Sequence, residues 1–324
     1  MYGLRSSPKA WQEHLAKVLT DLGLKQLQSE PSVYTNGNLY IMVYMDDLLF
    51  IGEPEEVTRI FKEMQTKMLL RHTGTCTTGK TVDFLGRRIT NKGDHFEISL
   101  NDSYTNDILQ EANLLKATPA VTPGATTSTS TPEQEELLDK QEHAQYRRLV
   151  GKLQWLSYTR PDLSFAVKEL ARSLQQPTFW DKQRLRHCLR YLAGTSNHKF
   201  VIQPTIQLTS TNKEPLALNV YTDADWAGRH VTRKSTTGFV IQFLGTTVHF
   251  GSGTQAVVAL SSAESEFYAI GTGATEALHL KNFLGEILTN NLKIHTDSSS
   301  GKSMATRIGV SKRAKHIELK YVFI

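Results

Sequence analysis

Two short apolar runs near the start of the chain flank a pair of acidic residues. Residues 39–45 and 48–51 are apolar or aromatic, and Asp46 and Asp47 lie between them. Runs of this length on either side of a polar turn predict a β-hairpin with both carboxylates at its tip. Apolar residues then recur at helical spacing over residues 57–68, which predicts a helix that covers one face of the sheet.

The middle of the chain has the periodicity of amphipathic helices. Apolar residues recur at helical spacing over residues 146–156, 163–174 and 181–192. In the last of these stretches the leucines share one face, whereas Lys and Arg occupy the rest of the helix surface. The pattern predicts a small helical unit with a basic exterior.

The last third of the chain is dominated by strand-like segments. They occupy residues 216–222, 237–244, 246–250 and 256–260. A predicted helix follows over 262–288, and after it come a further strand-like run at 292–296 and a final helix. This order predicts a mixed sheet with helices, in which loops at the strand ends can gather side chains.

Two polar stretches separate these patterns. The run TPGATTSTSTP at Thr122–Pro132 lacks the apolar residues of a core and is typical of a linker, and a second polar stretch covers 203–215. We therefore expect an α+β multi-domain chain. Its parts are a first unit at residues 1–116, a Thr/Ser/Pro-rich linker at 117–140, a helical region at 141–202 and a strand-rich domain at 216–324.

Basic residues are concentrated in one part of the chain. The formal net charge is +5, and residues 139–199 hold twelve Lys or Arg against five Asp or Glu. Such a segment suits a polyanion, although basic residues on amphipathic helices often form only a solvated face. Charge alone leaves both interpretations open.

Cysteine content and hydropathy indicate the kind of cellular compartment in which the protein is expected. Cys76 and Cys188 have neither metal-ligand spacing nor a disulfide framework, which fits a reducing compartment. No apolar run reaches the roughly 18 residues that a membrane span needs. We expect a soluble protein inside the cell with no membrane partner, and the sequence does not distinguish the cytoplasm from the nucleus.

The acidic pair in the predicted hairpin has two interpretations. Aspartate is common in turns for its geometry alone. Two carboxylates so close together also repel each other unless a cation shares them, and Mg²⁺ prefers such hard oxygen ligands. The spacing of Asp46 and Asp47 by itself does not decide between a turn and a metal site.

A second set of acids stands at the ends of elements in the last domain. Asp223 and Asp297 each end a predicted strand, and Glu264 and Glu266 occupy the first turn of the long helix. Glu264 has the capping-box spacing from Ser261, which leaves Glu266 to face the strand ends. Asp223, Glu266 and Asp297 therefore form a candidate site for two Mg²⁺ ions that activate water against a phosphodiester.

Ordered motifs in the first unit resemble copia-type reverse transcriptases. The string IMVYMDDLLFIG resembles the catalytic hairpin of these enzymes, MYGLRSSPKAW resembles the segment before it, and DFLGRR resembles a strand after it. The resemblance implies a partial polymerase palm in which Asp46 and Asp47 hold Mg²⁺, with Mn²⁺ as a substitute. In the opening segment, the positions that match a loop and helix near template and nucleotide are Tyr2, Gly3, Leu4, Pro8 and Trp11, and Lys9 is expected to contact nucleic acid.

The last domain resembles the ribonuclease H domain of the same elements. The strings that carry the resemblance are, in order, YTDADWAG, RKSTTGFV, ALSSAESEFYAI, HTDSSS and KRAKHIELKYVFI. The resemblance implies a ribonuclease H-like mixed sheet with Asp223, Glu266 and Asp297 as catalytic and metal-binding acids. His316 is interpreted as structural, and neither it nor Glu318 is assigned to catalysis.

The region between these domains resembles the small helical connection of the family. YRRLVG, the triplet Arg160–Pro161–Asp162 and the run LRYL carry this similarity. Implied partners are an RNA template, a DNA primer and an RNA–DNA hybrid, with deoxynucleotides if the polymerase site is completed. The residues expected to contact nucleic acid here are Arg147, Arg148, Arg184, Arg186 and Arg190.

The family resemblance also sets expectations about the two ends of the chain. Its members carry a further metal-binding Asp before the opening segment and a fourth nuclease acid after the last one. We therefore expect an RNA-directed DNA polymerase with ribonuclease H whose two sites are incomplete in this chain. The alternatives are an inactive nucleic-acid-binding remnant and an unstable fragment with exposed strand edges.

Overall fold

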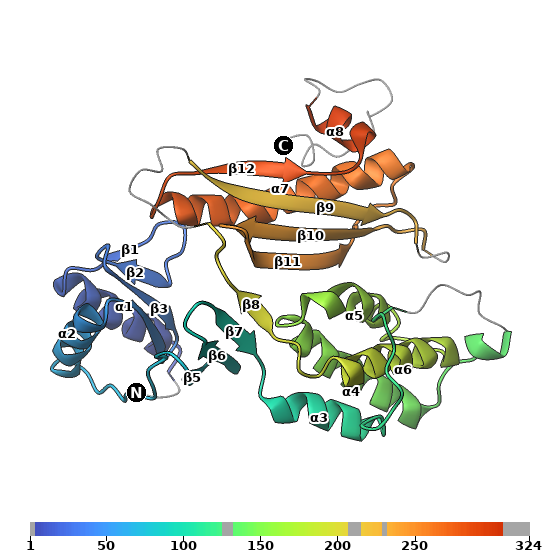
Figure 1. Cartoon of the computed structure of the whole chain (residues 1–324), viewed down its shortest axis with the longest axis horizontal. Helices are drawn as coiled ribbons and strands as arrows, with labels where there is room; N and C mark the ends of the chain where they lie inside the picture. Colours follow the sequence, from blue (N-terminus) through green and yellow to red (C-terminus); the bar gives the residue numbers. More distant parts are fainter. Residues whose placement is uncertain (1–3, 125–131, 207–214, 229–231, 307–324) are drawn as a thin grey trace.

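The structure, a computed structural model, describes residues 4–124, 132–206, 215–228 and 232–306. This part of the chain forms three four-stranded sheets and the helices that cover them (Figure 1). Tyr2, Gly3, residues 125–131 of the predicted linker and the segment KRAKHIELKYVFI, with His316 and Glu318, lie outside the described residues. No helix in the described part is long and apolar enough to cross a membrane.

The first unit is an antiparallel sheet packed against two helices. Its strands lie in the order β1 (Lys25–Gln26), β2 (Val33–Thr35), β3 (Leu39–Tyr44) and β4 (Asp47–Gly52). Helices α1 (Ser7–Asp21) and α2 (Pro54–Gln65) supply the rest of its core. Each helix has a proline in its first turn, where the missing backbone N–H costs nothing.

The predicted hairpin and the helix after it are confirmed. Strands β3 and β4 pair from Leu39 with Gly52 to Tyr44 with Asp47. Helix α2 ends at Gln65, before the predicted end at residue 68. Strands β1 and β2 were not predicted, because runs of two or three residues are too short to show a period.

A second sheet joins segments that are far apart in the chain. Strands β5 (Thr81–Phe84), β6 (Arg87–Asn91) and β7 (Phe96–Ser99) form an antiparallel meander, and β8 (Phe200–Ile202) adds to β7. The string DFLGRR, interpreted above as one strand, covers the end of β5, a turn at residues 85–86 and the start of β6. Its glycine and the preceding leucine both have positive φ, which is the geometry of a tight turn between paired strands.

The helical unit has one continuous core. It consists of α3 (Asp102–Glu111), α4 (Lys140–Ser157), α5 (Ser164–Ala171) and α6 (Phe179–Gly194), with short 3-10 turns at Pro132–Glu135 and Pro161–Leu163. The helices predicted in the middle of the chain are confirmed, and their apolar faces point inward. Helix α3 shares this core although it precedes the Thr/Ser/Pro-rich stretch, so residues on both sides of that stretch pack together.

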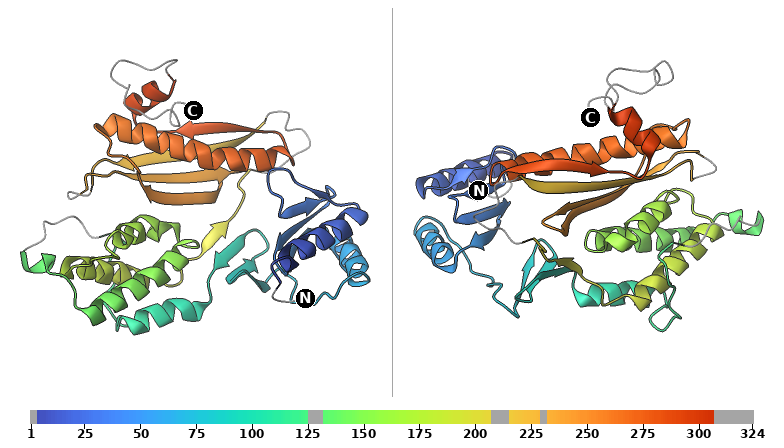
Figure 2. Two further views of the ribbon diagram at one scale, coloured as in Figure 1. Left: turned by 180° about the vertical axis from the view of Figure 1, so that it is seen from behind. Right: turned by 45° about the horizontal axis from the view of Figure 1, so that its top comes forward.

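The third sheet is mixed, as predicted. Its strands lie in the order β11 (Thr246–Thr254), β10 (Thr236–Phe243), β9 (Leu216–Asp225) and β12 (Asn290–His295). Neighbouring strands are antiparallel except β12, which runs parallel to β9. Helix α7 (Ser262–Gly285) connects β11 to β12 across one face of the sheet, as the view from behind shows (Figure 2), and α8 (Ser299–Thr306) follows β12.

The strand predicted at residues 256–260 is wrong. Strand β11 ends at Thr254, whose partner Thr236 is the first residue of β10. Beyond that pair no strand among the described residues continues the ladder, and the apolar run 256–260 is irregular. It leads instead into the first turn of α7.

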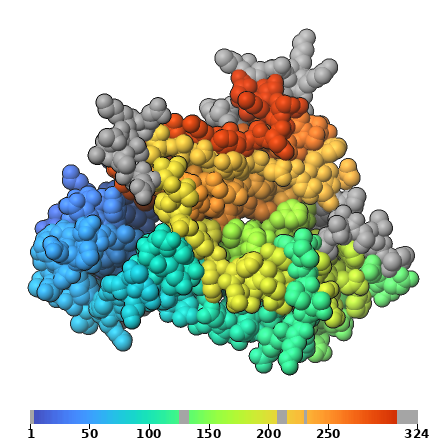
Figure 3. Space-filling model, viewed as in Figure 1, coloured from blue at the N-terminus to red at the C-terminus, as the bar shows by residue number. Residues whose placement is uncertain are grey.

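Helix α7 lies very close to β9. A Cβ atom on Gly273 would lie 2.5 Å from the Thr222 side chain and 3.1 Å from that of Val220. Only glycine permits this approach, which brings the start of the helix to the end of β9. The space-filling view shows the domain built on this sheet lying along the first unit, the second sheet and the helical unit (Figure 3).

Candidate metal centre and hairpin carboxylates

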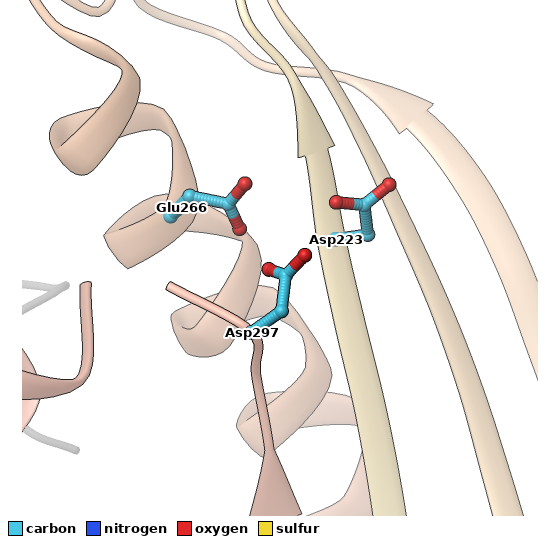
Figure 4. Close-up of side chains that lie close together, drawn as sticks. All are labelled: Asp223, Glu266 and Asp297. Atoms are coloured by element: carbon cyan, nitrogen blue, oxygen red, sulfur yellow. The ribbon is translucent and has the colours of Figure 1, made fainter. Parts of the chain in front are cut away.

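Three carboxylates from separate elements converge at one edge of the third sheet. Asp223 lies near the end of β9, Glu266 in the first turns of α7 and Asp297 two residues after β12. One carboxylate oxygen of each lies within 4.8 Å of the others. The side chains point toward one another (Figure 4). The structure thus brings together the acids that the sequence singled out in this domain.

Topology explains why these acids meet. Strands β9 and β12 are parallel and adjacent, so their carboxyl ends lie at the same edge of the sheet. Helix α7 begins at that edge because it crosses back over the sheet to reach the start of β12. Strand ends and a helix start therefore share one small volume, the arrangement found at many sites in mixed sheets.

Glu266 is the electrostatically unusual member of this cluster. Burial, followed by the charges of Asp223 and Asp297, raises the pKa of its carboxyl to about 7, while a hydrogen bond from the Ala224 backbone N–H opposes the shift. Its Oε2 atom is buried and has no hydrogen-bond partner. A buried acceptor without a donor, beside two other acids, fits the ligand set of a divalent cation.

Glu264 has a different environment. Its backbone N–H donates to the Oγ of the N-cap residue Ser261, and its carboxylate accepts from the Leu260 N–H and the Tyr268 hydroxyl. Only 4% of the residue is exposed. The prediction that Glu264 is structural and that Glu266 faces the strand ends agrees with this placement.

Asp46 and Asp47 lie at the tip of the β3–β4 hairpin. Asp47 begins β4 opposite Tyr44, and Met45 and Asp46 form the turn. Both acids are exposed, and in the described part of the chain no third acidic, His or Cys side chain completes a metal cluster with them.

The turn itself is held in an uncommon conformation. Met45 has φ of 51°, a region that residues with a side chain rarely adopt. The Trp11 indole N–H donates to the Met45 carbonyl at 2.9 Å, so α1 supports the turn. Strain of this kind is maintained only where the surrounding structure fixes it.

The basic residues expected to contact nucleic acid differ in their surroundings. Lys9, Arg148 and Arg184 pair with Glu13, Glu111 and Asp181, and Arg190 donates to the Thr118 carbonyl. Arg147 is exposed on α4, and Arg186 is exposed beside a hollow between α3, α4 and α6. These last two have no ion pair among the described residues, so their charge is available to a ligand.

Residues 1–126 match the family model described as reverse transcriptase (RNA-dependent DNA polymerase). The whole chain is 29% identical to the retrovirus-related Pol polyprotein from transposon RE2 of Arabidopsis thaliana, of which it covers 22%. An uncharacterized mitochondrial protein of the same plant is 31% identical over 244 residues, which cover 74% of this chain and 92% of that protein. The chain belongs to the retrotransposon Pol family of reverse transcriptases. It spans about a fifth of the length of the polyprotein relatives that it matches.

A solved reverse transcriptase has a similar fold. The foamy viral protease–reverse transcriptase in complex with an RNA/DNA hybrid aligns with a TM-score of 0.51 at 13% identity. The alignment covers 99% of this Pol-family chain and 36% of that protein. The likeness concerns the fold, a mixed α/β arrangement with several sheets.

The family match and the acid cluster lie in different parts of the chain. The hairpin acids Asp46 and Asp47 lie inside the matched residues 1–126, whereas Asp223, Glu266 and Asp297 lie beyond them. The sequence did not identify Gly301 on α8 as part of the cluster's surroundings, although a Cβ there would lie 3.0 Å from Cβ of Glu266. A single glycine in a short polar helix gave no signal of this contact.

Proposed function

We propose that this Pol-family chain cleaves the RNA strand of RNA–DNA hybrids at Asp223, Glu266 and Asp297. The observation that carries the proposal is the convergence of the three carboxylates, with a buried and unpaired Glu266 oxygen, at the ends of two parallel strands. The mixed strand order β11-β10-β9-β12, with α7 across one face, supports assignment of a ribonuclease H-like domain.

The three acids would hold Mg²⁺, or Mn²⁺ in its place. Bound divalent ions polarise a phosphodiester oxygen and lower the pKa of a water ligand. The chain's own contribution is to place negative oxygens together and to orient them. The Ala224 N–H orients the Glu266 carboxylate, and Gly301 leaves room for α8 beside it.

The surroundings of the acid cluster suit a nucleic-acid strand. Trp226 follows β9 directly, and its indole N–H donates to the Ala259 carbonyl at 3.0 Å while 44% of the residue remains exposed. An aromatic face fixed in this way can pack on a sugar or base. We assign recognition of the hybrid to its backbone and 2′-hydroxyl groups rather than to its sequence. Arg147 and Arg186, on the helical unit, are the basic residues proposed to contribute, because neither has an ion pair among the described residues.

A second proposed activity is RNA-directed DNA polymerisation at the β3–β4 hairpin. The family match over residues 1–126 favours it, because this range contains Asp46 and Asp47. In this proposal the pair holds Mg²⁺ while a primer is extended on an RNA template with deoxynucleotides. The proposed parts are a partial polymerase at 1–116, a linker at 117–140, a helical connection at 141–202 and the nuclease domain at 216–324.

Cleavage of a labelled RNA–DNA hybrid in Mg²⁺ tests the nuclease proposal. The purified chain should release RNA fragments, and Asp223→Asn should abolish their release while leaving hybrid binding intact. Matched cleavage by the wild type and the variant would exclude this site. Salt-sensitive hybrid binding without any cleavage would support the alternative of an inactive nucleic-acid-binding remnant.

A further inference from the structure

A buried glutamine lies between the elements that carry the acid cluster. Gln255 follows β11 directly and is 6% exposed. Its side-chain N–H group donates to the Ser265 carbonyl on α7 at 2.8 Å and to the Thr237 hydroxyl on β10 at 3.1 Å. One amide therefore joins the first turn of α7 to the sheet.

The orientation of this amide follows from its partners. A backbone carbonyl can only accept a hydrogen bond, so the nitrogen of the Gln255 side chain must face Ser265. Its Oε1 atom, by contrast, is buried and has no hydrogen-bond partner. A buried acceptor left without a donor destabilises the fold, whereas the two bonds that the nitrogen makes oppose this cost.

Both partners of the amide are next to acids of the cluster. Ser265 precedes Glu266 on α7 and is fully buried. Thr237 pairs with Ala224 across β10 and β9, and Ala224 follows Asp223 and donates its N–H to Glu266. Glu266 is therefore connected to Asp223 through Ser265, Gln255, Thr237 and Ala224. The connection consists of two side-chain hydrogen bonds, one pair of residues on neighbouring strands and two steps between adjacent residues in the chain.

The backbone of Gln255 strengthens the same connection. Its N–H donates to the Ser235 carbonyl at 3.0 Å, and the Ser235 hydroxyl accepts from the Ala227 N–H at 3.1 Å. Ala227 has φ of 52° in the turn that leaves β9. Ser235 and Ala227 are both buried, so this turn is fixed from inside the domain.

We infer that Gln255 is a positioning residue that fixes Glu266 on α7 relative to Asp223 on β9. It touches neither substrate nor ion. It acts through the Ser265 carbonyl and through Thr237, alongside the Ala224 N–H bond to Glu266 that also joins α7 to the sheet. The expected effect of Gln255 on metal binding rests on the proposed function, whereas its expected effect on the geometry of α7 does not.

The test compares two variants of the full chain. Gln255→Met keeps the length of the side chain and removes both N–H donors. Ile241→Val is the matched control, because it weakens the fully buried core of the same sheet without touching this network. Amide hydrogen exchange without metal reports on the start of α7, and calorimetric titration with Mn²⁺ reports on the acid cluster.

The inference predicts a local effect. In Gln255→Met, exchange should rise at residues 264–268 but not in the second half of α7, and the Mn²⁺ affinity should fall by about 10–100-fold, as for other residues that orient metal ligands. Ile241→Val should change neither. Wild-type exchange and wild-type Mn²⁺ affinity in Gln255→Met would overturn the inference.

Failure of the proposed function gives a different result. If the wild type binds no Mn²⁺, the metal site is wrong, while raised exchange at 264–268 in Gln255→Met still supports the positional role. If the wild type binds Mn²⁺ and Asp223→Asn does not, the metal site stands, and an unchanged Gln255→Met variant removes only the role of Gln255.

Discussion

The backbone N–H of Ser29 donates to the carboxylate of Glu286 at 2.7 Å, across 257 residues of sequence. The Gln28 N–H and the Ser29 hydroxyl donate to the same carboxylate, and His279 lies 3.8 Å from Glu30. The loop between β1 and β2 is therefore attached to the C-terminal half of α7. Through this contact the unit that carries the hairpin acids meets the unit that carries the acid cluster.

Replacing Glu286 should release this attachment. In Glu286→Ala the Gln28 and Ser29 amides lose their acceptor, and their hydrogen exchange should accelerate by about tenfold, the scale of one hydrogen bond to a charged group. Glu276→Gln, on the same helix but in contact with His249, is the control. Unchanged exchange at both amides in Glu286→Ala would contradict the contact.

The stability of the metal-free chain should fall as pH rises toward neutrality. Burial, followed by the charges of Asp223 and Asp297, raises the pKa of Glu266 from 4.5 to about 7. A raised carboxyl pKa favours the folded state below the unfolded value, and this contribution is lost as pH rises through the folded value. Thermal melts in EDTA between pH 4.5 and 8 should show the fall in wild type and a smaller one in Glu266→Gln. Parallel curves would refute the assignment.

The Arg160–Asp162 pair should stabilise the helical unit. Arg160 is 3% exposed and donates to both Asp162 oxygens and to the Thr195 carbonyl. Asp162→Asn leaves a buried guanidinium without its counter-charge, which costs roughly 3–5 kcal/mol when a buried pair is broken. Urea denaturation measures the change. The exposed pair of Glu56 and Arg59 is the control, and Glu56→Gln should unfold at the wild-type urea concentration.

Two glycines in helices should respond in opposite directions to alanine. Gly273→Ala places a Cβ 2.5 Å from Thr222 and should destabilise the chain by about 1–3 kcal/mol through overpacking. Gly151→Ala on α4 meets nothing within 4 Å and should stabilise it by about 0.5–1 kcal/mol, the usual helix preference. Stabilisation by Gly273→Ala in chemical denaturation would show that α7 does not lie this close to β9.

Hybrid binding should depend on the unpaired arginines more than on the paired one. Arg147→Gln and Arg186→Gln should each weaken binding at low salt and reduce the slope of log affinity against log salt by about one phosphate contact. Arg148→Gln, whose guanidinium already pairs with Glu111, should change the slope less. Fluorescence anisotropy over a salt series compares them, and equal slopes in all three variants would exclude a specific basic face.

Hydrophobic periodicity and sequence motifs predicted the elements whose pattern lies within one continuous stretch of sequence. The hairpin around Asp46 and Asp47 and the helices of the middle unit have long, regular patterns, and the structure contains them. The convergence of Asp223, Glu266 and Asp297 could be predicted because parallel neighbours end at the same edge of a sheet. The capping-box spacing from Ser261 then identified Glu264 as structural and left Glu266 to face the strand ends.

Features that depend on distant partners could not be predicted. The sequence of residues 256–260 does not show that the neighbouring strand β10 has no residue before Thr236 to pair with them. Their apolar pattern therefore suggested a strand. Gln255 carries no periodic signal, because its role comes from Ser265 and Thr237 on other elements. The packing of α3 with helices beyond the Thr/Ser/Pro-rich stretch is likewise a property of three-dimensional contacts.

The pairing of β8 with β7 decides how the helical unit is attached. The chain leaves the second sheet at β7, builds the helical unit, and returns to the neighbouring position as β8. The helical unit is also bonded to the third sheet, because Lys168 and Arg172 on α5 donate to the Thr236 hydroxyl on β10. The unit is therefore held by backbone pairing on one side and by side-chain hydrogen bonds on the other.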